Sequence, residues 1–138
     1  MSPIILLVDD EPDFSQGVAR LIASGFPEVG LRTAQTGQEA LYILEREHIS
    51  LMITDLRMPG LGGQELLAQA LTDHPQLTVI VLTGYGSVEA AVGAMRGGAY
   101  DFITKPIQKD DLFRTVAKGL ERARLLGENT TLRELAHA

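Results

Sequence analysis

The sequence predicts an α/β fold, a doubly wound five-stranded parallel sheet with helices on both faces, and three observations point to it. Five short apolar runs recur along the chain of 138 residues. Several of these runs are apolar at every position, as strands covered on both faces of a parallel sheet are. Stretches with helical spacing of apolar residues separate the runs. Because right-handed crossovers return the chain to the same sheet, this alternation predicts a single parallel sheet.

Each element rests on its own apolar pattern. The runs that predict strands are, in chain order, residues 4–8, 31–34, 51–54, 78–82 and 101–103. The spacings that predict helices follow each run: Phe14, Val18, Leu21 and Ile22; Ala40, Leu41 and Leu44; Leu66, Leu67, Ala70 and Leu71; Val88, Ala91, Val92 and Met95; and Leu112, Val116, Leu120 and Ala123. The last helix begins at about Asp110, and nothing obvious stops it before Gly127.

The length predicts one domain with a short appendage. Beyond Leu126 the apolar pattern breaks and then resumes at Leu132. We therefore expect a domain over residues 1–126 and a linker or helical extension over residues 127–138. Five glycines crowd the fourth helix and its flanks, at positions 84, 86, 93, 97 and 98. This segment is expected to be locally soft, and the alternative is a helix of small residues packed closely against a neighbour.

Composition excludes several classes of protein. The chain has no cysteine, so it has no disulfide scaffold, thiolate nucleophile or sulfur-ligated zinc site, and its three histidines are scattered. The apolar runs are far shorter than the ~20 residues that span a bilayer, and the first residues carry no basic segment. A cytoplasmic protein is therefore expected. The net charge of -6 argues against direct nucleic-acid binding by this chain.

Polar side chains follow the predicted strands where parallel strands share one edge of the sheet. Asp9 and Asp10 end the first strand, Asp55 the third, Thr83 the fourth and Lys105 the fifth. Because ligands gather at the carboxyl ends of such strands, we expect these groups to converge. Crowded carboxylates repel one another unless a cation lies among them, and hard oxygen ligands suit Mg²⁺. One carboxylate can then act as a nucleophile toward a phosphoryl donor, with lysine and hydroxyl stabilising the transferring oxygens.

Each of these features alone has an ordinary structural explanation. Acidic residues before Pro12 are common at the start of a helix. Thr83 followed by glycine is most often a turn, and a lysine before a proline is usually a solvated strand end. Asp55 needs a partner because it follows a buried strand, but a structural cap would supply one. Their joint occurrence at four strand ends is what favours a phosphoryl-acceptor site.

The same residues resemble the receiver domain of two-component response regulators over about residues 3–126. The matching motifs are Val8-Asp9-Asp10-Glu11, Asp55-Leu56-Arg57-Met58-Pro59 with Gly63, Thr83-Gly84 and Lys105-Pro106. The resemblance implies a flavodoxin-like (βα)5 fold with strand order 2-1-3-4-5. It is closest to receivers of transcription activators, in which the last helix often extends into a dimerising linker.

The resemblance also implies a role for each residue. Asp55 would accept the phosphoryl group, and Asp10 would bind Mg²⁺ directly, Asp9 through water and Arg57 through its main-chain carbonyl. Thr83 would contact the phosphoryl group and Lys105 would pair with it through a cis Lys-Pro peptide. Phe102 matches the family's switch aromatic, which turns inward when Thr83 moves.

The implied partner is a sensor histidine kinase or phosphotransfer protein. The chain would be a signalling switch that promotes its own aspartyl phosphorylation and dephosphorylation and controls an output in transcription regulation. A homodimer on phosphorylation is expected through the fourth helix, fifth strand and fifth helix, or through the extension of the fifth helix. The reason is that Leu112, Val116, Leu120 and Ala123 cannot all face inward on a long helix.

Three alternative functions fit the sequence less well. A flavin mononucleotide binder needs an uncharged, hydroxyl-rich loop after the first strand, where this chain has Asp9-Asp10-Glu11. A haloacid dehalogenase phosphatase needs a second aspartate two residues after Asp55, where this chain has Arg57. A phosphorylation-independent interaction module would be expected to lack Asp10, Asp55 or Lys105, and all three are present.

Overall fold

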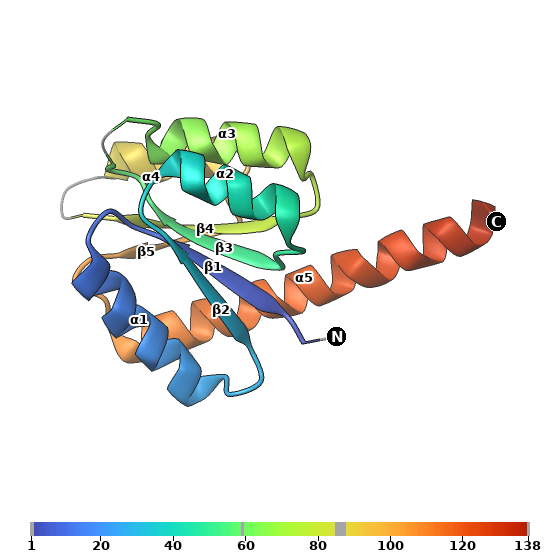
Figure 1. Cartoon of the computed structure of the whole chain (residues 1–138), viewed down its shortest axis with the longest axis horizontal. Helices are drawn as coiled ribbons and strands as arrows, with labels where there is room; N and C mark the ends of the chain where they lie inside the picture. Colours follow the sequence, from blue (N-terminus) through green and yellow to red (C-terminus); the bar gives the residue numbers. More distant parts are fainter. Residues whose placement is uncertain (1, 59, 85–87, 138) are drawn as a thin grey trace.

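Five parallel strands form one sheet in the computed structural model, which describes residues 2–58, 60–84 and 88–137. The strands are β1 (Ile4–Val8), β2 (Gly30–Ala34), β3 (Leu51–Asp55), β4 (Thr78–Thr83) and β5 (Asp101–Thr104). Their order in the sheet is β2-β1-β3-β4-β5, so the predicted strand order is confirmed (Figure 1). Asp55 and Thr83 are the last residues of their strands. Pro59 and Gly86, which the sequence patterns included, lie outside the described residues.

The helices cover both faces of the sheet, as a doubly wound fold requires. They are α1 (Pro12–Gly25), α2 (Gly37–Arg46), α3 (Gly63–Asp73), α4 (Val88–Arg96) and α5 (Lys109–His137). Helices α2, α3 and α4 lie on one face, and α1 and α5 lie on the other (Figure 1). Alternate residues of the central strands point into the two resulting cores, with Leu6, Met52 and Val81 on one side and Ile5, Ile53 and Ile80 on the other.

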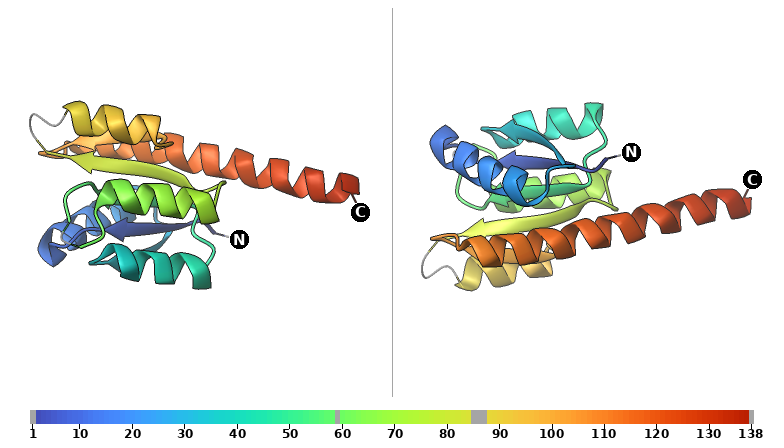
Figure 2. Two further views of the ribbon diagram at one scale, coloured as in Figure 1. Left: turned by 90° about the horizontal axis from the view of Figure 1, so that it is seen from above. Right: turned by 90° about the horizontal axis from the view of Figure 1, so that it is seen from below.

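Helix α5 packs its apolar stripe on the sheet and then extends beyond the domain. Leu112 and Val116 are fully buried, and Leu120 packs against the same core, so the stripe does face the sheet. Ala123 is half-buried and outside this core, so three of the four residues face inward and the stripe gives less reason for dimerisation than the sequence predicts. The helix also continues through Gly127 to His137 as one element that projects from the domain (Figure 2). A single helical glycine costs only about 1 kcal/mol, too little to end a helix that has no proline.

Glycines of the α4 region allow α4 to pack closely on α3. A Cβ atom at Gly93 would lie 3.2 Å from Gln64 Nε2, and one at Gly97 would lie 3.3 Å from Leu67 Cδ2. At Gly98, φ is +109° and an added Cβ would lie 2.7 Å from Leu71 Cδ1. These contacts support close packing as one reason for the glycines. Among the described residues, no helix is both long and apolar enough to cross a membrane.

Candidate functional site

Asp55 is held at the carboxyl end of β3 by backbone contacts. Asp55 is 7% exposed, and its Oδ1 accepts a hydrogen bond of 2.9 Å from the backbone N–H of Arg57. The next residue, Leu56, donates its backbone N–H to the carbonyl of Leu82 on β4 at 3.2 Å. This continues the sheet one step beyond Asp55. The carboxylate is therefore fixed in direction by main-chain geometry.

Gly63 allows α3 to begin directly against this turn. A Cβ atom at position 63 would overlap the carbonyl oxygen of Asp55 and the Cα of Leu56. The backbone N–H of Gly63 also donates to the carbonyl of Leu56 at 3.2 Å. The chain thus closes tightly behind Asp55, and glycine is the residue that fits.

Lys105 reaches Asp55 from the opposite side of the site. Its Nζ donates a hydrogen bond of 2.5 Å to Asp55 Oδ2 and lies 3.7 Å from Asp9 Oδ2. The ammonium also lies 4.4 Å from the centre of the Phe14 ring. Burial lowers the pKa of Lys105, but the hydrogen bond and charge of Asp55 outweigh burial and raise it overall. The Lys105-Pro106 peptide is cis, as the resemblance implied.

Asp9 is the most buried acid of the site. It is 3% exposed, and its Oδ1 accepts a 2.9 Å hydrogen bond from the backbone N–H of Glu11. Its Oδ2 is buried and has no hydrogen-bond partner. Burial is the main cause that raises the pKa of Asp9 from 3.8 to about 6, and the charge of Asp55 adds to it, while Glu11 and Lys105 act in the opposite direction.

Asp10 lies next to this cluster in sequence but does not join it. Its side chain is exposed, whereas Asp9 and Asp55 share the ammonium of Lys105. Within the described part of the chain, no three acidic or histidine side chains are grouped closely enough to hold a metal ion. Two of the three expected carboxylates therefore converge. An exposed carboxylate is hydrated and avoids the two buried ones, because a single ammonium offsets only part of their negative charge.

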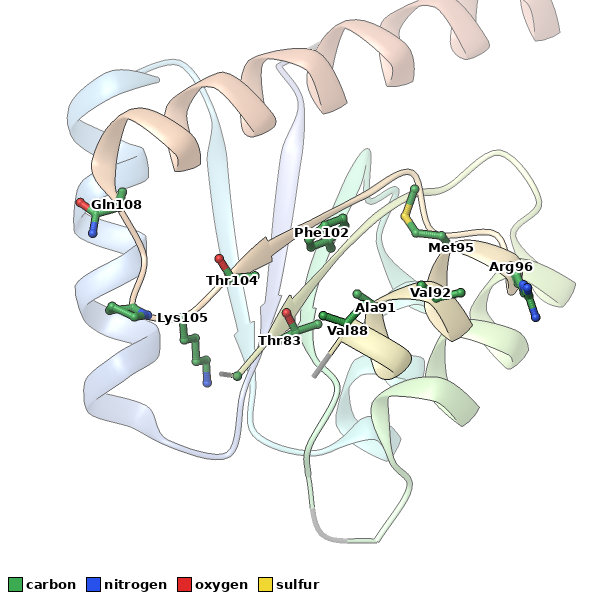
Figure 3. A pocket seen from close by; sticks show the side chains of 12 residues that line it. Thr83, Val88, Ala91, Val92, Met95, Arg96, Phe102, Thr104, Lys105 and Gln108 are labelled. Atoms are coloured by element: carbon green, nitrogen blue, oxygen red, sulfur yellow. The ribbon is translucent and has the colours of Figure 1, made fainter. Parts of the chain in front are cut away.

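Thr83 and Phe102 lie on neighbouring strands beside this charged group. Thr83 is 3% exposed and pairs with Thr104 across β4 and β5. The Phe102 ring is 41% exposed and lines a pocket of about 680 Å³ with Val88, Val92 and Met95 of α4. Figure 3 shows these side chains around the pocket, with Lys105 at the end nearest Thr83. Phe102 is therefore not a core residue in this structure.

Two residues near the site were missed by sequence reasoning. Phe14 was treated as a core residue of α1, but its ring also faces the Lys105 ammonium. Ser15 is 5% exposed, and its hydroxyl has no hydrogen-bond partner. Its spacing of three from Val18 placed it on the buried face of α1, and a polar residue at such a position was the available signal.

Comparison with known proteins shows which family has this arrangement of residues. The family model of the response regulator receiver domain matches residues 5–117. The transcriptional regulatory protein GlrR of Escherichia coli is 39% identical over 120 residues, which are 86% of this chain and 26% of GlrR. The C4-dicarboxylate transport transcriptional regulatory protein DctD of Pseudomonas aeruginosa is 40% identical over 130 residues, 94% of this chain and 28% of DctD. The chain thus spans about a quarter of the length of these relatives.

A solved structure agrees with the family match. The receiver domain of NtrX from Brucella abortus superposes with a TM-score of 0.79 and 38% sequence identity, covering 85% of this chain and 98% of that one. The family model matches most of the chain. The structure adds the sheet order and a buried aspartate at the end of β3 that is paired with a lysine. The chain belongs to the response regulator receiver domains of two-component signal transduction.

Proposed function

We propose that Asp55 accepts a phosphoryl group from a sensor histidine kinase or phosphotransfer protein and that this reaction switches the domain. The observation that carries the proposal is the geometry of the carboxylate. One oxygen is bonded to the Arg57 N–H and the other to the Lys105 ammonium, so the carboxylate is fixed at the open edge of the sheet. A fixed nucleophile next to a cation suits attack on a phosphoryl donor.

The transfer makes one bond and breaks one. An Asp55 oxygen forms a P–O bond, while the P–N bond of phosphohistidine breaks and imidazole leaves with the electron pair. With acetyl phosphate, a P–O bond breaks and acetate leaves. The Lys105 ammonium balances negative charge on the transferred oxygens, and the Thr83 hydroxyl donates a hydrogen bond to one of them.

The acidic residues of the site supply oxygen ligands of the kind that a hard divalent cation prefers. Asp9 Oδ2 is buried 3.7 Å from the Lys105 ammonium and makes no hydrogen bond, so it has an acceptor position left for a metal-bound water. In the proposed site Asp10 and Asp55 would hold Mg²⁺ directly, with the exposed Asp10 side chain turned toward Asp55, while Asp9 would act through water and Arg57 through its main-chain carbonyl. Bound Mg²⁺ would supply positive charge beside the transferring oxygens.

Mass spectrometry after incubation with acetyl phosphate and Mg²⁺ tests the nucleophile. We expect one added phosphoryl group, which Asp55→Asn abolishes. The matched control is Asp73→Asn at the exposed end of α3, which should be labelled like the wild type. Labelling that survives Asp55→Asn would contradict the proposal, as would labelling without divalent cation.

The metal ligands have their own test. Asp10→Ala should weaken Mg²⁺ binding by about tenfold or more, because a charged ligand is lost. Asp13→Ala, a change to the exposed acid in the first turn of α1, should leave the affinity unchanged. Lys105→Ala should largely keep metal binding and impair phosphorylation. An unchanged affinity in Asp10→Ala would place the metal elsewhere.

Output is proposed to lie in transcription regulation, because the relatives GlrR and DctD are transcriptional regulatory proteins. Direct DNA contact is assigned to another part of the system, since this chain carries a net charge of -6.

A homodimer is proposed through the exposed apolar residues Val88, Val92, Met95 and Phe102 of α4 and β5. Sedimentation with beryllofluoride should show a dimer that Val92→Glu abolishes and that Tyr42→Glu, at an exposed position on α2, leaves intact. A monomer under all conditions would contradict the dimer.

A further inference from the structure

A small cavity lies beside Asp9, between α1 and the ends of the central strands. Its volume is about 10 Å³, close to the space that one water molecule requires. Six of the residues that line it are apolar: Leu7, Val8, Phe14, Val18, Ile53 and Leu82. The other two are Asp9 and Ser15. The cavity is therefore lined almost wholly by apolar groups, with two polar residues at its wall.

Both polar side chains carry an unsatisfied atom. Asp9 Oδ2 and the Ser15 hydroxyl oxygen are buried without a hydrogen-bond partner, although the Lys105 ammonium lies 3.7 Å from Asp9 Oδ2, and their residues are 3% and 5% exposed. A serine on a helix commonly bonds the carbonyl four residues earlier, but the Ser15 hydroxyl makes no such bond. Buried polar groups without partners are rare in proteins because they lose their hydration. Two such groups at one cavity need a common explanation.

We propose that Ser15 is a positioning residue for Asp9, which it holds through one buried water in this cavity. The water would donate a hydrogen bond to Asp9 Oδ2 and accept one from the Ser15 hydroxyl. The backbone N–H of Glu11 already fixes Oδ1, so the water fixes the remaining oxygen and with it the plane of the carboxylate. The inference rests on the proposed function, in which Asp9 orients a water on Mg²⁺.

Ser15 acts on the metal only through Asp9. It lies on the buried face of α1, whereas the proposed ligands stand at the open edge of the sheet. Residues that orient metal ligands typically change metal affinity when removed. The effect of Ser15 should therefore appear in Mg²⁺ binding and should depend on the Asp9 carboxylate.

The first measurement is the Mg²⁺ affinity of the full chain, by isothermal titration. Ser15→Ala should weaken binding measurably, but by less than the tenfold expected for loss of the direct ligand Asp10. The matched control is Ser24→Ala on the same helix, where an exposed hydroxyl bonds the Leu21 carbonyl at 2.7 Å far from Asp9. That variant should bind Mg²⁺ like the wild type. Equal affinity of Ser15→Ala and wild type would overturn a positioning role.

The second measurement needs no metal. Urea unfolding in EDTA is compared for the wild type, Ser15→Ala, Asp9→Ala and the double variant. If Ser15 holds Asp9, Ser15→Ala lowers the folding equilibrium constant about fivefold in the wild-type background and has no effect beside Asp9→Ala. An equal effect in both backgrounds, or a stabilising Ser15→Ala, would overturn the contact. If wild type binds no Mg²⁺, the metal site of the proposed function fails, while this cycle still decides the Ser15–Asp9 contact.

Discussion

The acid cluster and the α4–β5 surface adjoin at Thr83 but differ in what they bury. In the acid cluster, Asp9 and Asp55 are 3% and 7% exposed and share the ammonium of Lys105. On the α4–β5 surface, by contrast, Val88 is 72% exposed and Phe102 is 41% exposed. Charge is buried in one region and apolar side chains face solvent in the other.

The difference in what is buried suits the two regions to different roles. A desolvated charge is costly unless fixed partners compensate it, so the acid cluster is stabilised by specific contacts and responds strongly to a change in charge. An exposed apolar ring gains free energy when it becomes covered, by inward rotation or by a partner. The first region is therefore suited to chemistry, and the second is suited to a change of conformation or contact.

The largest expected effect comes from the turn that supports Asp55. Gly63→Ala would bring a Cβ atom into the backbone of Asp55 and Leu56, so the turn must shift. We expect a loss of about 3 kcal/mol in the free energy of unfolding, measured in urea. The control is Gly17→Ala on α1, where nothing lies within 4 Å of an added Cβ. This control should stabilise the protein by about 0.5 to 1 kcal/mol. Equal stabilities of the two variants would show that the turn is not tightly fixed.

The next effect is a pH dependence that originates at Asp9. Its pKa is raised from 3.8 to about 6, so the folded state holds the proton more tightly than the unfolded state. The free energy of unfolding contributed by Asp9 is therefore highest below about pH 4 and falls as the pH rises to about 6. Asp9→Asn should remove this decline. In EDTA, the free energy of unfolding of the variant minus that of the wild type should therefore rise by about 2 kcal/mol between pH 4 and pH 7. Parallel pH profiles would contradict a desolvated Asp9.

The smallest effect on stability is expected on the α4–β5 surface. Val92 is 44% exposed, so Val92→Ser should change the free energy of unfolding by less than about 0.5 kcal/mol. Val81→Ser in β4, where the residue is fully buried, should cost several times more. A large loss in Val92→Ser would mean that this surface is already covered and would remove the contrast between the regions.

The sequence predicted the fold and most of the site because both depend on periodic or adjacent residues. Apolar runs placed the five strands, and the residues after them placed Asp55 and Lys105 at one edge. The inward face of α5 was misjudged, since apolar spacing alone does not show how far a helix packs on its sheet. The exposure of Asp10 and the unsatisfied Ser15 hydroxyl depend on side-chain packing in three dimensions, which adjacency in sequence does not encode.

We expect that phosphorylation of Asp55 changes the α4–β5 surface through Thr83, whose movement lets Phe102 rotate inward. The most direct measurement compares the Phe102 ring signals by NMR in the free chain and in the chain with beryllofluoride, which stands in for the phosphoryl group at Asp55. In the wild type, we expect the Phe102 ring to move from an exposed environment in the free chain to a buried one in the beryllofluoride-bound chain. In Thr83→Ala the signals should stay in place although beryllofluoride still binds. Phe102 ring signals that are the same in the free and beryllofluoride-bound wild type would contradict a switch that runs through Thr83.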